Sequence, residues 1–209
     1  MSEIKIGRIV MGRFTTNCYF VYRDDLKEAV VIDPADSGDY LYEALTGKGF
    51  KVVGILLTHC HFDHIFGVED LRKLAGVKVY AYQGEEDLLG DMELNCSASV
   101  GRPKQIEADV LLRDGEEIEL GGIKIKTIHT PGHTSGSACF YIEEAGFLLA
   151  GDTLFNLSVG RSDLPTGNGP VLERSVREKL FTLPDDTKVY PGHGDSTTIG
   201  FEKENNPFF

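Results

Sequence analysis

The sequence predicts an α+β protein in which two mixed β-sheets pack face to face, with helices on their outer sides. Three observations support this class. Strand-like segments come first and then alternate with helical ones, and the same order returns in the second half of the chain. No linker or low-complexity tract separates the halves, about 1–110 and 111–209, so we expect a single domain over residues 1–209. Several predicted strands end directly before polar side chains, where α/β folds place their sites.

The first half begins with segments that alternate or run apolar between turn residues, which predicts an antiparallel meander. Leu41 and Leu45 then lie at helical spacing ahead of a glycine, so we expect a short helix. The next strand carries no polar side chain, which predicts burial on both faces. The strands are predicted at 4–10, 18–22, 29–32, 52–57 and 77–80, and the helices at 40–47, 68–74 and 84–92.

The second half follows a segment without periodicity. Residues 95–107 contain Gly101 and Pro103, so they form either a surface connection or a flap over the site. Asp114 and Gly115 are a hairpin signal at the start of this half. The strands predicted after it lie at 117–120, 123–128, 137–142, 147–150 and 188–190, and the helix at 172–181.

Composition and charge restrict the classes of function and partner that the protein can have. The 209 residues are 41 % hydrophobic and 26 % charged, which is typical of a globular protein with its own core. No apolar stretch approaches the roughly 18 residues of a membrane span, and residues 1–13 lack the apolar centre of a secretory signal, so we expect a cytoplasmic protein without membrane association. The net charge of −12 disfavours nucleic acid as a partner and requires local positive charge for an anionic substrate.

The four cysteines show no C-x-x-C spacing. In a cytoplasmic protein this pattern favours reduced, buried thiols over a disulfide framework. Cys60 lies between two candidate metal ligands, and we interpret it as a buried thiol rather than as a ligand or redox group.

The strongest functional signal is the His-Cys-His-Phe-Asp-His segment at 59–64. Imidazole nitrogens and carboxylate oxygens are the ligands that zinc, iron(II) and manganese accept. His59 and His61 lie two residues apart, a spacing that puts both on one side of an extended loop. Asp63 and His64 are displaced around that loop, so the segment predicts two metal ions rather than one.

Further candidate ligands follow three later strands, each beside a glycine that lets the backbone pass close to a cation. They complete two sets of ligands with room for a shared water, and an open position is typical of a catalytic metal site. The predicted sets are His59, His61 and His133 for one ion and Asp63, His64 and His193 for the other, with Asp152 bridging.

Two neighbouring residues compete with these assignments. His129 lies four residues before His133, and we favour His133 because the Pro131-Gly132 turn points it inward. Asp33 also follows a predicted strand but has no histidine beside it in the sequence, so we expect it to support a ligand or form a turn.

With these motifs the chain resembles the metallo-β-lactamase superfamily. The segment at 59–64, His133, the Gly-Asp-Thr-Leu-Phe segment at 151–155 and the Pro-Gly-His segment at 191–193 match that family's ordered motifs, between about residues 52 and 208. The resemblance implies a four-layer αβ/βα sandwich with a dinuclear site at one edge, between the sheets.

Within the superfamily, Asp152, the segment 160–165 and the tail 198–207 resemble the glyoxalase II-like hydrolases. The longer glyoxalase II enzymes carry an extra helical region after the last histidine. Only 16 residues follow His193 here, so the chain is similar to the short, single-domain relatives and is expected to lack a separate C-terminal helical domain.

The resemblance implies a hydrolase of hydroxyacyl thioesters such as S-lactoylglutathione, with two divalent ions, of which zinc is favoured over iron and manganese. A hydroxide bridging the ions would be the nucleophile, with Asp63 orienting it and accepting its proton. The motifs offer no additional general acid, which favours a thiolate leaving group with a pKa of about 8.5 over an amine or alkoxide. Arg161 either anchors a carboxylate of the thiol half or pairs with Asp163 to fix the loop.

Other activities of the fold remain open at this stage. A persulfide dioxygenase of the same superfamily would use one iron(II), for which His59, His133 and Asp152 would serve. A β-lactamase is disfavoured because no export signal is visible, and a ribonuclease because the chain is acidic. A non-enzymatic metal-binding module would need a filled coordination shell, and the candidate ligands leave an open position.

Overall fold

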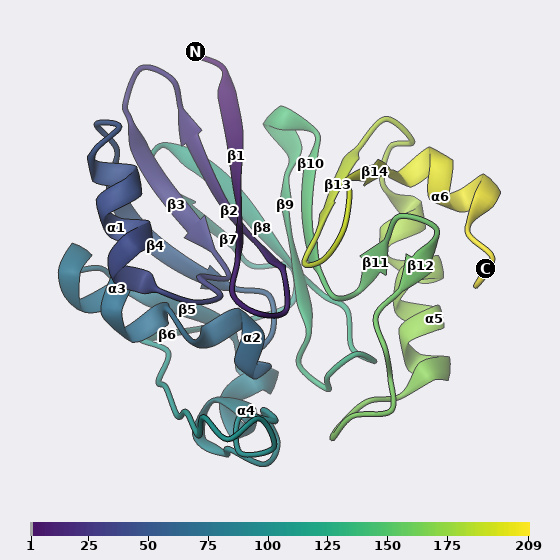
Figure 1. Ribbon diagram of the computed structural model, residues 1–209. Helices are drawn as coiled ribbons and strands as arrows, with labels where there is room; N and C mark the ends of the chain where they lie inside the picture. The colour runs from purple at the N-terminus through teal and green to yellow at the C-terminus, as the bar shows by residue number, and fades with distance from the viewer. Residues whose placement is uncertain (1) are drawn as a thin grey trace.

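The computed structural model describes residues 2–209 and contains two six-stranded sheets that face each other (Figure 1). In the first sheet β1 to β3 are antiparallel, and β3 to β6 are parallel. The antiparallel part is the predicted meander. The strands, in spatial order, are β1 (Ile4–Met11), β2 (Thr16–Arg23), β3 (Glu28–Ile32), β4 (Lys51–Leu57), β5 (Val79–Tyr82) and β6 (Val110–Leu112).

The second sheet is also mixed. Strands β7 to β10 are antiparallel, β13 runs parallel to β10, and β14 pairs antiparallel with β13. A separate small hairpin consists of β11 (Leu154–Phe155) and β12 (Ser158–Val159). The strands of the main sheet are β14 (Thr197–Thr198), β13 (Lys188–Pro191), β10 (Phe147–Gly151), β9 (Ala138–Ile142), β8 (Ile123–His129) and β7 (Glu117–Leu120).

Helices cover the outer face of each sheet, α1 and α3 on one side of the molecule and α5 and α6 on the other (Figure 1). The α-helices are α1 (Gly38–Thr46), α2 (Phe62–Ile65), α3 (Val68–Ala75), α4 (Glu86–Gly90), α5 (Gly169–Glu178) and α6 (Ile199–Asn205). Short 3-10 turns are η1 (Gln83–Glu85), η2 (Glu143–Ala145) and η3 (Leu180–Thr182). The predicted αβ/βα sandwich is therefore confirmed.

Strand β4 shows how the layers are built. Successive side chains of a strand point to opposite faces, so Ile55 and Leu57 pack under the helices while Leu56 packs between the sheets. All three side chains are fully buried. Leu56 lies in one apolar cluster with Phe140 of the opposite sheet, and this cluster packs the two halves together.

The structure corrects several sequence-based boundaries. The turn at Asp114 and Gly115 does not close a hairpin, since it joins β6 of the first sheet to β7 of the second. The acidic helix expected at 84–92 is a 3-10 turn followed by the short α4. The short β6, β11, β12 and β14 were not predicted, because two or three residues carry no periodicity.

No helix in residues 2–209 combines the length and apolarity needed to cross a membrane.

Candidate metal centre

The seven predicted ligands meet at the ends of strands from both sheets. His59 and His61 follow β4, His133 follows β8, Asp152 follows β10 and His193 follows β13. Asp63 and His64 lie in α2, so they are helical rather than part of an extended loop as predicted. Three triads have ligand atoms within 4.8 Å of one another: His59, His61 and His133; His59, His64 and Asp152; and Asp63, His64 and His193.

The first triad brings imidazole lone pairs together. His133 Nδ1 lies 2.7 Å from the carbonyl oxygen of Arg161, which can only accept, so Nδ1 carries the hydrogen and Nε2 is unprotonated. His133 Nε2 in turn lies 2.9 Å from His61 Nδ1 and 3.2 Å from His59 Nε2. Such a convergence of imidazole nitrogens is a suitable donor set for a borderline divalent cation.

Asp33 fixes the orientation of one histidine in each set. Its Oδ2 accepts hydrogen bonds from His64 Nδ1 at 3.0 Å and from the Thr58 hydroxyl at 2.6 Å. Because that hydroxyl donates to Asp33, it accepts from His59 Nδ1 at 3.1 Å. His59 Nε2 and His64 Nε2 are therefore left to face the centre, which agrees with the supporting role expected for Asp33.

Asp152 lies between the two sets. Its Oδ1 is 3.4 Å from His64 Nε2, and its Oδ2 is 3.5 Å from His193 Nε2 and 3.7 Å from His133 Nε2. The carboxylate thus approaches histidines of both sets, which is the placement that a bridging ligand requires. Asp63 Oδ2 lies 3.3 Å from His193 Nε2 and accepts a hydrogen bond from the Thr16 hydroxyl at 3.2 Å.

Histidines of the two sets have pKa values shifted in opposite directions. Burial, and then repulsion from the neighbouring imidazoles, holds the pKa of His59 well below its usual value and lowers that of His61 to about 3. Burial also acts to lower the pKa of His64, but the carboxylates of Asp152, Asp63 and Asp33 outweigh it and raise that pKa. The pKa of His193 is raised as well, against burial, chiefly by its contact with Asp63.

The donor atoms of this centre lack partners of their own. In the described chain, His61 Nε2, His64 Nε2 and Asp152 Oδ1 are buried and make no hydrogen bond. Each such atom costs about 1–3 kcal/mol unless something replaces the lost water. His61 faces His133 through Nδ1, so its Nε2 points away from the centre. Cations at the centre would satisfy His64 Nε2 and Asp152 Oδ1, so the residues present fit a pair of divalent metal ions.

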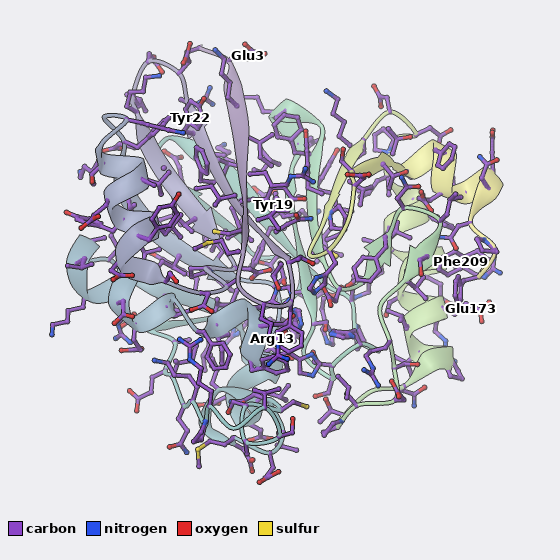
Figure 2. All side chains as sticks on the ribbon, in the orientation of Figure 1. Glu3, Arg13, Tyr19, Tyr22, Glu173 and Phe209 are labelled. Carbon is purple, nitrogen blue, oxygen red and sulfur yellow. The ribbon has the colours of Figure 1, made fainter. Side chains whose placement is uncertain are left out.

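The backbone at Gly192 packs closely against the side chains of Asp152 and His64. A Cβ on Gly192 would lie 2.2 Å from Asp152 Oδ1 and 2.7 Å from His64 Cε1, so only glycine is accommodated there. The same loop is held by Asn17, whose backbone N–H donates to the Gly192 carbonyl at 2.7 Å and whose side chain donates to Pro191. Figure 2 shows Tyr19 near the middle of the molecule, where its hydroxyl also donates to Pro191, at 3.0 Å.

Glu85 is a second support that the sequence analysis missed. It is fully buried and accepts hydrogen bonds from the backbone N–H of Cys60 at 2.7 Å, from that of Gly136 at 3.1 Å and from the Thr134 hydroxyl. Burial raises its pKa to about 7, although these donors act in the opposite direction. One carboxylate therefore ties the His59–His61 loop of the first half to the turn after His133 in the second half. A glutamate in an acidic, apparently exposed segment gave no sequence signal for this.

Three other sequence-based expectations have clear outcomes. His129 points away from the cluster, stacks on the ring of Tyr82 and contacts the Ser135 carbonyl. Cys60 is a fully buried free thiol, as expected. Arg161 forms a two-pronged ion pair with Asp163, at 2.7 and 2.8 Å, on an exposed loop. This is the loop-fixing arrangement, and a substrate carboxylate would have to compete with Asp163.

The segment 95–107 lies against the site. Its first residue, Asn95, is fully buried and its carbonyl accepts the N–H of Phe62 at the start of α2. Further along, Val100 and Arg102 line a cavity beside Asp63. This segment is thus a wall of the site rather than a distant surface connection.

The sandwich and its edge cluster of histidines and aspartates define a metallo-hydrolase fold of the β-lactamase type. The family model described as the metallo-beta-lactamase superfamily matches residues 11–193, and the chain belongs to that superfamily.

Curated relatives narrow the comparison. The chain is 37 % identical to the "probable metallo-hydrolase YqgX" of Bacillus subtilis, over 98 % of this chain and 97 % of the relative. It is 34 % identical to "hydroxyacylglutathione hydrolase GloC" of Haemophilus influenzae, over 98 % of both chains.

Solved structures agree on the fold and differ in their titles. The structure titled "BLEG-1 B3 metallo-beta-lactamase" has a TM-score of 0.93 and 39 % identity, and covers 98 % of this chain and 99 % of its own. "TTHA1623 in a di-iron-bound form" has a TM-score of 0.86 and 34 % identity, over 97 % of this chain and 100 % of its own. "ETHE1 from Myxococcus xanthus" has a TM-score of 0.81 and 28 % identity, over 97 % and 83 %.

Metal binding should release protons. His64 and His193 have raised pKa values in the metal-free protein and carry protons that a metal would displace. Near pH 7 we expect release of about one to two protons per chain, and an affinity that increases as the pH rises. Calorimetric titration of Zn²⁺ in two buffers of different ionisation enthalpy measures this number. Equal heats in both buffers would contradict it, and His129→Gln, outside the cluster, should leave the number unchanged.

Removing the Glu85 carboxylate should loosen both ligand loops. In Glu85→Ala, two buried backbone N–H groups and the Thr134 hydroxyl lose their acceptor, so we expect a loss of about 3 kcal/mol in the free energy of unfolding. Zn²⁺ affinity should fall roughly 10- to 100-fold, and Glu85→Gln, which keeps one acceptor, should lose less. Urea unfolding and metal titration measure both effects. The matched control is Glu86→Ala, at the exposed neighbour; equal effects of the two alanine variants would refute the assignment.

Proposed function

We propose that this protein hydrolyses thioesters, using two divalent metal ions held by the seven side chains of the metal centre. The observation that carries the proposal is the position of Asp152 between two donor sets, with the unpartnered His64 Nε2 and Asp152 Oδ1 at their common centre. In this assignment His59, His61 and His133 hold one ion, Asp63, His64 and His193 hold the other, and Asp152 bridges them. The similarity to a relative named hydroxyacylglutathione hydrolase supports it.

The chain's own residues account for orientation and proton transfer. Two divalent cations, when bound, would lower the pKa of a shared water to about 7 and polarise the substrate carbonyl. We propose that Asp63 orients that water and takes its proton. The Thr16 hydroxyl, 3.2 Å from Oδ2, and His193 Nε2, 3.3 Å from the same oxygen, fix the orientation of this carboxylate. Asp33 keeps His59 and His64 in the tautomers that present Nε2 to the centre.

The surroundings of the centre favour a thiol leaving group. The linings of the cavities beside Asp63 and beside Arg161 contain no lysine, tyrosine or histidine to protonate a departing group. A thiol of pKa about 8.5 leaves as the thiolate without such help, whereas an amine or alkoxide needs a general acid. We propose zinc as the ion, with iron or manganese as alternatives. The four free, buried cysteines fit a reducing compartment, so the proposal includes a cytoplasmic location.

Two other activities have specific support. The similarity to ETHE1 and to a di-iron form keeps an iron(II) persulfide dioxygenase as an alternative, with His59, His133 and Asp152 as its ligands. His133 Nε2 lies 3.2 Å from His59 and 3.7 Å from Asp152, which permits it. The similarity to a B3 metallo-beta-lactamase makes β-lactam hydrolysis a further test.

The first test combines metal content with turnover. Protein purified without added metal should contain two ions per chain and should hydrolyse S-lactoylglutathione equally fast under nitrogen and in air. Thiol release, oxygen uptake and the opening of a β-lactam such as nitrocefin are measured on the same sample. One iron per chain, no hydrolysis and oxygen uptake with glutathione persulfide would establish the dioxygenase instead, and β-lactam opening without thioester cleavage would establish a lactamase.

The bridging role of Asp152 has its own test. Asp152→Ala should lose at least one of the two ions, and kcat/KM for the thioester should fall about a thousandfold, because the shared water loses one of its cations. Metal analysis and thiol-release kinetics measure both. Asp186→Ala, at an exposed aspartate remote from the centre, is the matched control. Full turnover and full metal content in Asp152→Ala would refute the bridging assignment.

A further inference from the structure

A cavity of about 420 Å³ opens beside Asp63, on the side of the metal centre that carries His193. It lies between the turn that joins β1 to β2 and the segment 95–107. Its volume falls within the roughly 300–1,000 Å³ of small-molecule sites. Neither the ligand set nor the attack on a carbonyl accounts for this space, which extends away from the centre.

The walls of the cavity are mostly apolar and are held in place by aromatic contacts. Met11, Phe14, Phe66 and Val100 line it. Phe14 packs edge-on against Phe62 at 4.8 Å between ring centroids, and Phe66 packs against the same ring at 5.7 Å. The largely exposed Phe14 and Val100 are thus part of a formed wall, and an apolar ligand would gain by covering them.

Two arginines line this cavity, and their environments differ. The Arg102 guanidinium lies 4.1 Å from the centre of the Phe66 ring and 3.1 Å from both carboxylate oxygens of Asp36, so its charge is already paired. Arg13 is exposed at the β1–β2 turn and has no ion pair or side-chain hydrogen bond among residues 2–209 (Figure 2). In a chain of net charge −12, this unpaired cation at a cavity mouth is a site for an anion.

Two separate cavities flank the centre, and the two substituents of a thioester carbonyl leave it in different directions. The second cavity, of about 560 Å³, opens beside Arg161, whose carbonyl contacts His133, and it shares no lining residue with the cavity beside Asp63. The charge of Arg161 is already paired with Asp163, whereas that of Arg13 is unpaired among residues 2–209. The cavity beside Asp63 is therefore the one that can select an anionic substituent.

We propose that this cavity binds the acyl group, and that the preferred acyl group has an apolar chain ending in an anionic group that pairs with Arg13. The inference rests on the proposed thioesterase function and names its substrate class: ω-carboxyacyl thioesters rather than short neutral or hydroxyacyl ones. Apolar atoms would lie against Met11, Phe66 and Val100, and the terminal carboxylate would reach the turn.

The test is a series of thioesters of one neutral thiol, N-acetylcysteamine. In the metal-loaded protein kcat/KM should rise by about two- to fourfold per methylene from acetyl to hexanoyl, as apolar surface is covered. Glutaryl and adipoyl thioesters should exceed their neutral counterparts, pentanoyl and hexanoyl, by about two- to fivefold, mainly through KM. Calorimetry with the matching thioethers, which lack the reactive carbonyl, measures binding independently of turnover.

Two substitutions in the cavity, with one control outside it, test which residues set the preference for the acyl group. Arg13→Gln should reduce the ratio of adipoyl to hexanoyl kcat/KM about two- to fivefold, and Arg113→Gln, at an exposed arginine away from the cavity, should preserve that ratio. Val100→Phe should narrow the cavity and shift the optimum toward shorter acyl groups. Neither variant should change discrimination between thiols.

The outcomes separate this inference from the proposed function. Thioester hydrolysis that is indifferent to the acyl group, or variants that alter the preference for the thiol instead, would overturn the acyl assignment and leave the thioesterase intact. If no thioester is cleaved, the thioesterase fails. Binding of the carboxylated thioether that depends on Arg13 would then still support the anion site. If the thioether does not bind, or binds equally well without Arg13, the anion site is refuted as well.

Discussion

The structure depends on one electrostatic constraint: five imidazoles and two carboxylates converge in a small, largely buried volume. Without cations, lone pairs face one another at hydrogen-bonding distance, and buried donors and acceptors stay unsatisfied. The pKa values show the same conflict, because they are lowered for His59 and His61 and raised for His64 and His193. Positive charge at the centre would relieve both conflicts, because it would attract the lone pairs and replace the lost water.

Keeping the ligands in that position requires rigid supports, and these are themselves buried polar groups. Asp33 controls one histidine of each set, Glu85 ties the loop after β4 to the turn after β8, and Asn17 holds the loop that carries His193. Each support crosses from one segment of the chain to a distant one. The metal centre and the packing of the two sheets are therefore a single cooperative structure, which explains why the site lies at their common edge.

The two cavities beside the centre offer different chemistry. One is lined by Arg161, which is paired with Asp163 on an exposed loop. The other has an aromatic and aliphatic wall that ends at Arg13, whose charge is unpaired within the described chain. In an acidic protein this asymmetry would favour one binding orientation of the substrate. An apolar surface and a single cation together orient an amphipathic anion more strongly than either does alone.

Local patterns in the sequence were enough to predict the class of fold and the clustered side chains. Apolar periodicity is local, so β4, α1, α3 and α5 were predicted, and the histidine-rich segment at 59–64 indicated metal ligation. The Pro131-Gly132 turn favoured His133 over His129, and in the structure His133 lies in the cluster while His129 stacks on Tyr82. The fold was needed to show that Asp63 and His64 lie in a helix and that Asp114 and Gly115 join two sheets, because both depend on contacts between distant segments. Glu85 and Arg13 gave no local signal, because their roles arise from burial and from neighbours far along the chain, which no short stretch of sequence encodes.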